Sequence, residues 1–419
     1  MKNKPEKRPA PARGKLTVLA QLCNLIPGHL VAKLAREHGV EAKARTFTAW
    51  SHVVTMLYAQ LTHAMGLNDV CDALRHHVGW LARIRGAKPP SRNTLSHANR
   101  ERDATMAEAL FWAVLDHLRD LQPAFGGGQP RGLSRRFRRV IHVVDSTTIQ
   151  LVASCLDWAK HRRRKAAAKC HLRLDLQSLL PRFAIVDTAR DNDNARAREV
   201  CAGIRSGEIV IFDRAYVDFA HLFGLLVRGV FWVTRTKSNV QLRVVRKRLR
   251  HPKGRILRDD EVVLITTQSR REYPNRLRRI TAVVEVDGKE TIMEFLTNNF
   301  EWSAASVADL YRCRWQIEVF FKQIKQTLQL CDFLGYNANA VRWQVWTALL
   351  LYVLLRFQSF LHSWPHSFTR LFAMLRAVVW DNYDLGSLLQ FYGTAGGPWR
   401  MRAQPEQGYL PGLHPAAVG

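Results

Sequence analysis

The spacing of hydrophobic positions divides the chain into three parts. From about residue 17 to 122, apolar residues recur at intervals of three and four, as in FTAWSHVVTMLYAQLTHAMG and MAEALFWAVLDHL. This spacing predicts amphipathic helices. Short β-branched runs follow up to about residue 301, and helical spacing returns from Ser303 to His362. The order predicts a helical N-terminal domain followed by a mixed α/β domain.

The β-branched runs fall into two groups, each bounded by turn residues. The first group is RVIHVVD (139 to 145), TTIQLV (147 to 152), LPRFAIVD (180 to 187) and EIVIFD (208 to 213), with a helical stretch before the last. The second group is VFWVTRTK, DEVVLITT, RRITAVVEVDG and KETIMEFLTNN, in which Asp287-Gly288 is a hairpin signal. We therefore predict a mixed α/β sheet with a β-rich insertion at about 229–301.

Breaks in the pattern suggest domain boundaries. The Gly-, Pro- and Arg-rich joint FGGGQPRGLSRRFRR separates the helices from the strands. We expect the following segments: a disordered basic arm at 1–16, a helical domain at 17–125, an α/β core at 136–365, and a C-terminal helical segment and tail at 366–419.

A polar segment within the helical domain, PPSRNTLSHANRER, suggests a recognition helix. Ser91 and Thr94 are candidate helix caps. The side chains that could contact DNA are Asn93, His97, Asn99, Arg100 and Arg102. A solvated basic helix that merely covers the core explains the pattern equally well, so both interpretations stay open.

The net charge of the chain indicates what kind of partner the protein binds. The 419 residues include 63 Lys and Arg against 35 Asp and Glu, a net charge of +28. A field of this sign and strength favours nucleic acid as a partner. The longest strongly apolar run, Val345 to Leu355, is far shorter than the roughly 20 residues that a membrane span needs, and no signal-peptide core follows the N-terminus. Scattered cysteines without a C-x-x-C pair favour the reducing cytoplasm.

Two basic tracts concentrate this charge. Residues 159 to 174 hold seven Lys and Arg, and residues 235 to 258 hold ten, without an acidic residue in either. One such tract alone is usually a solvated face, but two tracts predict a surface that follows DNA phosphates. The expected contacts are Arg162, Arg163, Arg164, Lys165, Arg235, Lys237, Arg246, Lys247 and Arg248. Trp232 and Trp315 are candidates for stacking on an unpaired base, with burial in the core as the alternative.

Two aspartates end separate strands. Asp145 closes RVIHVVD and precedes Ser-Thr-Thr, and Asp213 closes EIVIFD and precedes Arg-Ala-Tyr. Carboxylates at neighbouring strand ends can converge on Mg²⁺, which prefers oxygen ligands. Either aspartate alone could equally be a turn former or cap.

A polar stripe is predicted on the segment LYRCRWQIEVFFKQIKQTLQL. At 100° per residue, Tyr311, Arg314, Glu318 and Lys325 lie within an arc of about 60° beside an apolar stripe. A carboxylate between cations and a phenol suits a metal-bound phosphodiester. The alternative is an exposed helix in which Arg314 and Glu318 form an i,i+4 ion pair. Such a pair stabilises a helix by about 0.3 kcal/mol.

The combination of these motifs resembles the DDE transposases of the insertion sequence 4 family. Tyr311, Arg314, Glu318 and Lys325 match the signature Y-(2)-R-(3)-E-(6)-K. DSTT at 145–148 and DRAY at 213–216 are similar to the family's first two acidic motifs, with Ala215 where the family often has Gly. The resemblance covers roughly residues 140 to 360.

The resemblance implies a ribonuclease-H-like catalytic core preceded by a helical DNA-binding domain. Asp145, Asp213 and Glu318 would bind two Mg²⁺ ions, for which Mn²⁺ can substitute. Tyr311, Arg314 and Lys325, with Lys322 beside them, would hold DNA. The implied activity is cut-and-paste cleavage and strand transfer at the terminal inverted repeats of the protein's own insertion sequence.

The same resemblance implies double-stranded DNA as partner, both as inverted repeats and as target. It also implies a dimer on paired DNA ends, no membrane association, and a location in the bacterial cytoplasm at the nucleoid. Two other classes stay open: a ribonuclease-H-like nuclease that does not transpose, and an inactive, domesticated DNA-binding regulator derived from a transposase.

Overall fold

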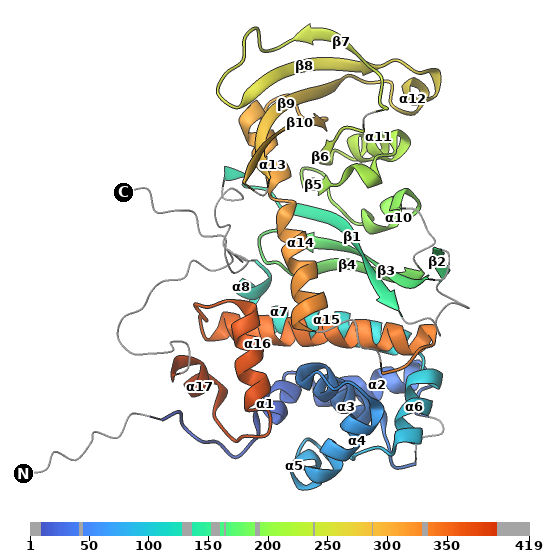
Figure 1. The fold of residues 1–419 in the computed structure, drawn as a ribbon, viewed down its shortest axis with the longest axis vertical. Coiled ribbons are helices and arrows are strands. Elements are labelled where there is room, and N and C mark those ends of the chain that lie inside the picture. The colour runs from blue at the N-terminus through green and yellow to red at the C-terminus, as the bar shows by residue number, and fades with distance from the viewer. Residues whose placement is uncertain are drawn as a thin grey trace, which may run out of the picture. The chain divides into compact units, whose positions relative to one another are not determined.

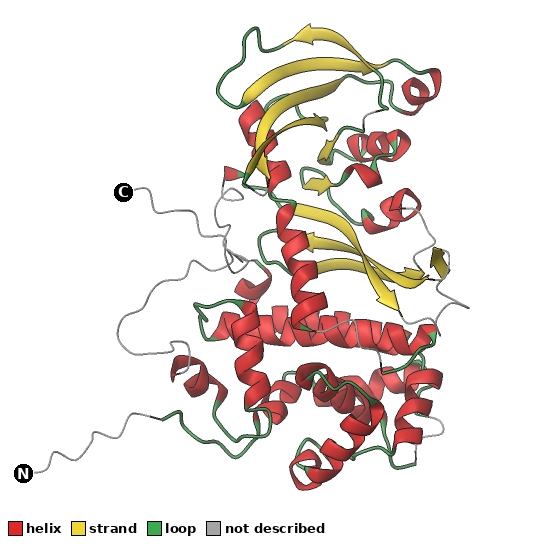
Figure 2. Ribbon diagram, in the orientation of Figure 1, coloured by secondary structure: helices red, strands yellow, loops and turns green. Residues whose placement is uncertain are grey.

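The chain forms two compact units. The helical unit comprises Met1–Leu121 and Gln323–Gly419, and the sheet unit comprises Gln122–Lys322. The computed structural model describes residues 10–41, 45–127, 136–151, 160–162, 165–188, 193–237, 239–286, 288–328 and 334–391. Figures 1 and 2 show that the strands lie in the sheet unit together with several helices, whereas the helical unit is built from helices.

The helical unit is built around one long apolar helix. Its elements are α1 (Val18–Asn24), α2 (Gly28–Glu37), α3 (Ala49–Thr62), α4 (Leu67–His76), α5 (Val78–Ala82), α6 (Arg92–Glu101), α7 (Thr105–Leu121), the π-helical η4 (Gln323–Thr327), α15 (Ala338–Leu361), α16 (Phe368–Ala377) and α17 (Leu385–Phe391). Helix α15 packs against α3 and α7. By length and composition α15 could cross a membrane, but most of its residues are buried inside this unit, as in a core helix.

The N-terminal arm differs from the prediction. Residues 1–9 lie outside the described part of the chain, but residues 10–16 do not form a free arm. The Gly14 amide donates a 2.6 Å hydrogen bond to the Asn382 carbonyl, and Arg13 forms a β-bridge with Tyr383. The prediction of disorder is therefore wrong for this segment, because its backbone groups pair with a C-terminal segment that sequence spacing does not reveal.

Helix α6 is the predicted candidate recognition helix. The Ser91 hydroxyl accepts a 3.2 Å hydrogen bond from the Thr94 amide, which confirms Ser91 as the cap. Two candidate side chains turn inward: Asn99 is buried with Oδ1 2.8 Å from His52 Nε2, and Arg102 donates to the carbonyl of Thr48 at 3.1 Å. The candidates that remain exposed are Asn93, His97 and Arg100.

We expect Ser91→Ala to lower the unfolding midpoint of the helical unit. The Thr94 amide would lose its partner at the start of α6, a loss of about 1 kcal/mol for a typical N-cap. Circular dichroism during denaturant unfolding measures the change. Ser96→Ala, on the same helix but away from its end, is the control; equal midpoints for the two variants would contradict the capping role.

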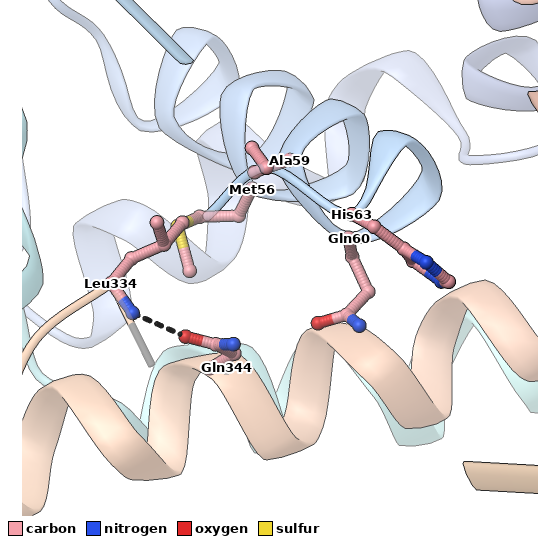
Figure 3. Close-up of a pocket in the computed structure, with 7 residues that line it drawn as sticks. Met56, Ala59, Gln60, His63, Leu334 and Gln344 are labelled. Carbon is pink, nitrogen blue, oxygen red and sulfur yellow. Dashed lines mark hydrogen bonds between the residues drawn. The ribbon is translucent and has the colours of Figure 1, made fainter. Parts of the chain in front are cut away.

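A small polar cavity lies inside the helical unit. Figure 3 shows Met56, Ala59 and Gln60 of α3, with the C-cap residue His63, on the side of the cavity across from Leu334 and Gln344. The Leu334 amide donates a 2.9 Å hydrogen bond to Gln344 Oε1. The cavity has a volume of about 10 Å³, which is room for one water molecule and not for a ligand.

The sheet unit contains one continuous sheet. Its strands are β1 (Ile141–Leu151), β2 (Lys160–Arg162), β3 (Lys165–Asp175), β4 (Pro181–Thr188), β5 (Ile209–Phe212), β6 (Phe231–Arg235), β7 (Leu242–Lys247), β8 (Ile256–Leu264), β9 (Leu277–Val286) and β10 (Lys289–Thr297). They follow the order β2-β3-β1-β5-β6-β10-β9-β8-β7, with β4 beside β3. The helices are α8 (Pro123–Gly126), α10 (Asp193–Val200), the 3₁₀ turn η3 (Arg214–Tyr216), α11 (Phe219–Val227), α12 (Thr267–Glu272), α13 (Ala304–Arg312) and α14 (Trp315–Lys322).

The centre of the sheet is parallel and its flanks are antiparallel. Strand β1 pairs parallel with β5 and β5 with β6, while β3 and β10 join the flanks in antiparallel pairing. Val144 lies opposite Phe212, and Phe212 lies opposite Thr234. The residues that follow these three positions are Asp145, Asp213 and Arg235, so they meet at one edge of the sheet.

Helices cover both faces of this centre. Val210, Phe212 and Trp232 belong to a buried cluster with residues of α10 and α11. Because side chains alternate along a strand, the residues between them face the other side, where α13 packs against β5, β6 and β10, and α14 packs against β1. The buried contact between Phe295 and Tyr311, 4.9 Å between ring centroids, anchors α13 there.

The mixed α/β architecture with an N-terminal helical region is confirmed, but several elements differ from the prediction. The runs at 139–145 and 147–152 form the single strand β1. Strand β3 was missed because its alanines and basic residues hide a row of buried positions within the first basic tract. Strand β6 belongs to the parallel centre and not to the insertion at 229–301, because it pairs with β5.

The boundary of the predicted core at 136–365 also differs. The sheet unit ends at Lys322, and the following residues belong with the N-terminal helices. The physical reason is that α15 is apolar on nearly every side and finds its packing partners in α3, α6 and α7. Sequence proximity to the strands therefore does not decide which unit α15 joins.

Candidate active site

Asp145 lies within β1, one residue past its parallel pairing with β5. Its Oδ1 accepts a 2.8 Å hydrogen bond from the Ser146 amide, and its Oδ2 accepts a 2.9 Å hydrogen bond from Arg314. The side chain is only 16% exposed. Burial raises the pKa of Asp145 to about 6, although Arg314 and the Ser146 amide act in the opposite direction. The repulsion of Asp213 and Glu318 contributes to the rise, so the three carboxylates are close enough to interact.

Asp213 follows β5 and begins the turn η3. Its Oδ1 accepts a 3.3 Å hydrogen bond from the Tyr311 hydroxyl of α13. Tyr311 is 7% exposed, and burial raises its pKa to about 12, with Asp213 adding to the rise. The phenol therefore stays protonated at neutral pH and acts as a hydrogen-bond donor that orients Asp213.

Arg314 joins two of the three carboxylates. It lies between α13 and α14, and its guanidinium donates to Asp145 through Nη1 and to Glu318 through Nη2. Burial lowers the pKa of Arg314, but the acidic groups around it raise it above the usual range overall. The guanidinium thus remains charged and offsets the repulsion between the two carboxylates.

The donor atoms fit a divalent metal, but a ready ligand group is not assembled. Within the described ranges, no three His, Cys, Asp or Glu side chains gather closely enough to hold an ion. Arg314 occupies the position between Asp145 and Glu318 where a cation would be needed. Carboxylate oxygens from three segments are the ligand type that Mg²⁺ prefers, so the chemistry of the site suits the ion.

The signature segment does not form the single helix that was predicted. Helix α13 ends at Arg312 and α14 starts at Trp315, with the Arg314 amide bonded to the Tyr311 carbonyl at 3.0 Å. The break turns Arg314 toward β1, which a continuous helical wheel cannot predict. Lys322 is exposed at the end of α14, and Lys325 is half-buried in η4, which belongs to the helical unit.

The two tryptophans that were candidates for base stacking lie in different environments. Trp232 is completely buried and packs edge-on against Tyr273 with the ring centroids 6.0 Å apart. It is therefore a core residue and not available for stacking on a base. Trp315 is 51% exposed at the start of α14, next to Arg314. Trp232, Val233 and Thr234 are all buried, because β6 lies inside the sheet between β5 and β10 and both of its faces are covered.

The second basic tract divides into two groups. Arg235, at the end of β6, is close enough to Tyr311 that its charge lowers the pKa of the phenol, and Lys237 donates to the Val217 carbonyl at 3.1 Å. Arg246 and Arg248 instead lie 3.7 and 3.5 Å from the carboxylate of Glu261 on β8. These two arginines are partly neutralised within the sheet, because antiparallel pairing places the acidic run after the tract opposite it.

Lys247 is exposed on β7, the edge strand of the sheet. In the first tract, Arg163 and Arg164 lie outside the described residues, and for Arg162 and Lys165 only the backbone, in β2 and β3, is described. Arg173 of this tract is buried and donates to the Ala202 carbonyl, so it does not contribute to a phosphate-binding surface.

Comparison with known proteins identifies the family. The family described as Transposase DDE domain matches residues 136–354, more than half of the chain, and one described as Domain of unknown function (DUF4372) matches residues 14–84. The chain is 32% identical over 302 residues to a putative transposase, y4zB, of Sinorhizobium fredii (strain NBRC 101917 / NGR234), covering 71% of this chain and 80% of that protein.

The relatives include transposases that are named for insertion sequences. A probable transposase for insertion sequence element IS5377 of Geobacillus stearothermophilus is 29% identical over 53% of this chain and 58% of its own length. Transposase InsG for insertion sequence element IS4 of Escherichia coli (strain K12) is 24% identical over 44% of this chain and 42% of its own length. A piggyBac transposase in a synaptic complex with hairpin DNA covers 92% of this chain and 84% of its own, at 10% identity and a TM-score of 0.44, which is too distant to assign a fold.

The family match spans all the residues that meet at the sheet edge, from Asp145 and Asp213 to Tyr311, Arg314 and Glu318. This chain belongs to the DDE transposases, and specifically to those of the IS4 type.

Proposed function

We propose that this transposase excises and inserts its own insertion sequence by a cut-and-paste reaction, with Asp145, Asp213 and Glu318 as the catalytic carboxylates. The observation that carries the proposal is the polar network at the sheet edge, in which Arg314 and Tyr311 hold carboxylates from three distant segments near one another. Without compensating charge, such a cluster of buried carboxylates would destabilise the folded protein by about 3 kcal/mol or more. Because groups that are this costly to stability are concentrated at functional sites, the cluster favours a functional role.

We also propose that the sheet unit has a ribonuclease-H-like core. Support comes from the order β4-β3-β1-β5-β6, in which three antiparallel strands are followed by two strands parallel to β1. Strands β7 to β10 form the insertion between β6 and α13. The insertion extends the same sheet, because β10 pairs with β6.

The three carboxylates are the groups that would hold two Mg²⁺ ions, with Mn²⁺ as a substitute. When bound, such ions activate an attacking water or 3′ hydroxyl and stabilise the leaving oxygen at phosphorus. Neighbouring groups of the protein orient the carboxylates: the Tyr311 hydroxyl donates to Asp213, and the Ser146 amide donates to Asp145. Arg314 keeps Asp145 and Glu318 together before the ions are bound.

Double-stranded DNA, as terminal inverted repeats and as target, is the proposed partner. Arg314 contacts Asp145 and Glu318, and Arg235 acts electrostatically on Tyr311. Lys322 ends α14, the helix that carries Glu318, and Lys325 follows in the signature. The exposed face of α6 is the candidate for recognition of the repeat. Because two ends must be joined in one event, we propose a dimer on paired DNA ends.

The test is cleavage of a labelled DNA end taken from the sequence that flanks the gene. The protein should nick the inverted repeat with Mg²⁺ and transfer the 3′ end into target DNA. Cleavage without transfer would favour the nuclease alternative, and binding without cleavage would favour a regulator. The same protein with an unrelated DNA end is the control.

We expect non-specific DNA binding to depend strongly on salt. Each phosphate neutralised by Lys or Arg lowers the slope of log K against log salt by about 0.9, so several contacts give a steep fall. Fluorescence anisotropy with an unrelated duplex at several salt concentrations measures the slope. A slope near zero would contradict a phosphate-binding role for the excess of +28 charges.

A further inference from the structure

A cavity of about 590 Å³ opens at the end of the sheet unit where β1 and α13 begin. Its lining combines cations, aromatic rings and hydroxyl groups: Arg136, Phe137, Arg138, Arg139, Trp302, Ser303 and Ser306. We call it the arginine cleft. It lies away from the carboxylates of the candidate active site, because those follow the opposite ends of β5 and α13.

The arginine cleft carries excess positive charge. Arg136 lies 3.2 Å from the Asp309 carboxylate, but Arg255 and Arg312 share that same carboxylate. Arg138 is exposed, and Arg139 donates only to a neutral carbonyl. Five arginines and one aspartate leave an excess of four charges in this part of the described chain.

Nearby acidic groups do not cancel this excess. Glu208 is 2.9 Å from His142 Nε2 and accepts from the Arg205 amide, but both partners are neutral, because burial lowers the pKa of His142, so Glu208 keeps its negative charge. Glu301 precedes the cleft residue Trp302 and is exposed, and it is not among the residues that line the cavity. If Glu208 and Glu301 are counted with Asp309, five arginines against three carboxylates still leave an excess of two positive charges. The surface of the cleft therefore attracts anions.

Arg139 is held in place before any ligand arrives. Its guanidinium lies over the Phe231 ring, 5.0 Å from the centroid, and donates a 2.8 Å hydrogen bond to the Gly207 carbonyl. Trp302 packs against Phe231 at 5.2 Å and against Phe137 at 5.4 Å, which makes the floor rigid. A fixed guanidinium loses little conformational entropy on binding, so contact with an anion is stronger.

The size and charge of the cleft suit a phosphodiester backbone. Guanidinium groups bind phosphate oxygens through paired, charge-assisted hydrogen bonds. The hydroxyls of Ser303 and Ser306 lie 2.8 Å apart and share one hydrogen bond, which leaves one hydroxyl proton to donate to a ligand. From Arg139 to Asp145 the chain advances six residues, which at about 3.3 Å per residue gives a separation of about 20 Å. Because B-DNA rises by about 3.4 Å per base pair, this equals about six base pairs.

We propose that the arginine cleft binds the backbone phosphates of DNA about six base pairs from the scissile phosphate, an inference that rests on the proposed function. In this role Arg138 and Arg139 contact phosphate directly. Arg136, fixed by Asp309, contributes to the field. The cleft positions the duplex without taking part in the chemistry.

The test uses the full-length double variant Arg138→Ala/Arg139→Ala. Its matched control is Arg270→Ala/Arg271→Ala, which removes two exposed arginines from α12 elsewhere in the same unit. With a labelled inverted-repeat duplex, the cleft variant should bind about 10- to 100-fold more weakly than the control, and its salt slope should be smaller by about two.

A second measurement locates the contact. Methylphosphonate links remove the charge of one DNA phosphate at a time. Parental protein should lose affinity when a link lies about six base pairs from the cut, and the double variant should be insensitive there. The single variant Arg138→Ala changes one exposed side chain and should reduce the salt slope of DNA binding by about one. It keeps the test decisive if the double variant does not fold.

The outcomes separate this proposal from the proposed function. Equal affinity and slope for the cleft and control variants would overturn the cleft, even if the protein cleaves DNA. A parental protein that binds through the cleft but never cleaves would sustain the cleft and overturn the catalytic proposal.

Discussion

Glu318→Gln is expected to abolish strand cleavage while binding to the inverted repeat persists. The amide keeps the size of the side chain but removes the charge needed to hold a metal ion. It also relieves repulsion of the DNA phosphates, so binding should be equal to or tighter than that of the parental protein. We expect the cleavage rate to fall by about 10²- to 10³-fold or more, the scale of losing one group that stabilises charge in a transition state.

A nicking assay and a gel-shift assay on the same labelled end measure the two effects separately. Glu301→Gln removes an exposed carboxylate from the same unit and serves as the control. If Glu318→Gln cleaves at the parental rate, α14 does not carry a catalytic carboxylate, and the assignment of its residues is wrong.

Arg314→Ala should destabilise the metal-free protein and weaken the complex with the DNA end. Without the guanidinium, Asp145 and Glu318 would repel each other in a site where Asp145 is only 16% exposed. Loss of one partner from a fully buried ion pair costs about 3–5 kcal/mol, and the partial exposure of Glu318 reduces this to about 1–3 kcal/mol. A divalent ion would replace the missing positive charge.

Thermal unfolding with a chelator and with Mg²⁺ measures this effect. The ion should raise the midpoint of Arg314→Ala more than that of the parental protein, because only the variant lacks its own cation between the two carboxylates. Arg271→Ala is the control for loss of an exposed arginine. If Arg314→Ala has the parental midpoint in the chelator, Arg314 does not hold the carboxylates together.

The candidate catalytic residues were predictable where the motif that contains them spans only a few consecutive residues. Asp145 and Asp213 each follow a β-branched run, and parallel pairing of β1 with β5 brings such positions to one edge. The i, i+4 spacing of Arg314 and Glu318 predicts their contact, which the structure confirms. The contact of Arg314 with Asp145 was not predictable, because it depends on the break between α13 and α14 and on the approach of α14 to β1.

Burial was the least predictable property. Trp232 and Arg173 lie in segments that indicate a DNA-binding surface, yet both are buried. The tract containing Arg246 has no acidic residue, but strand pairing places Glu261 opposite it. In each case the partner comes from another strand, so a window along the chain cannot show whether a cation faces DNA or an internal carboxylate.

By itself, the sequence predicted a basic α/β chain with helices before it. Its three acidic motifs in order, with Tyr311 and Arg314 beside Glu318, resemble those of a transposase family, and that resemblance gave the class of the protein. Periodicity and motif spacing are local, and one chain suffices to read them. Only the tertiary structure decided that α15 joins the N-terminal helices, that β6 belongs to the parallel centre, and that Arg314 bridges Asp145 and Glu318. These depend on packing and hydrogen bonding between segments far apart in the chain, which no local pattern encodes.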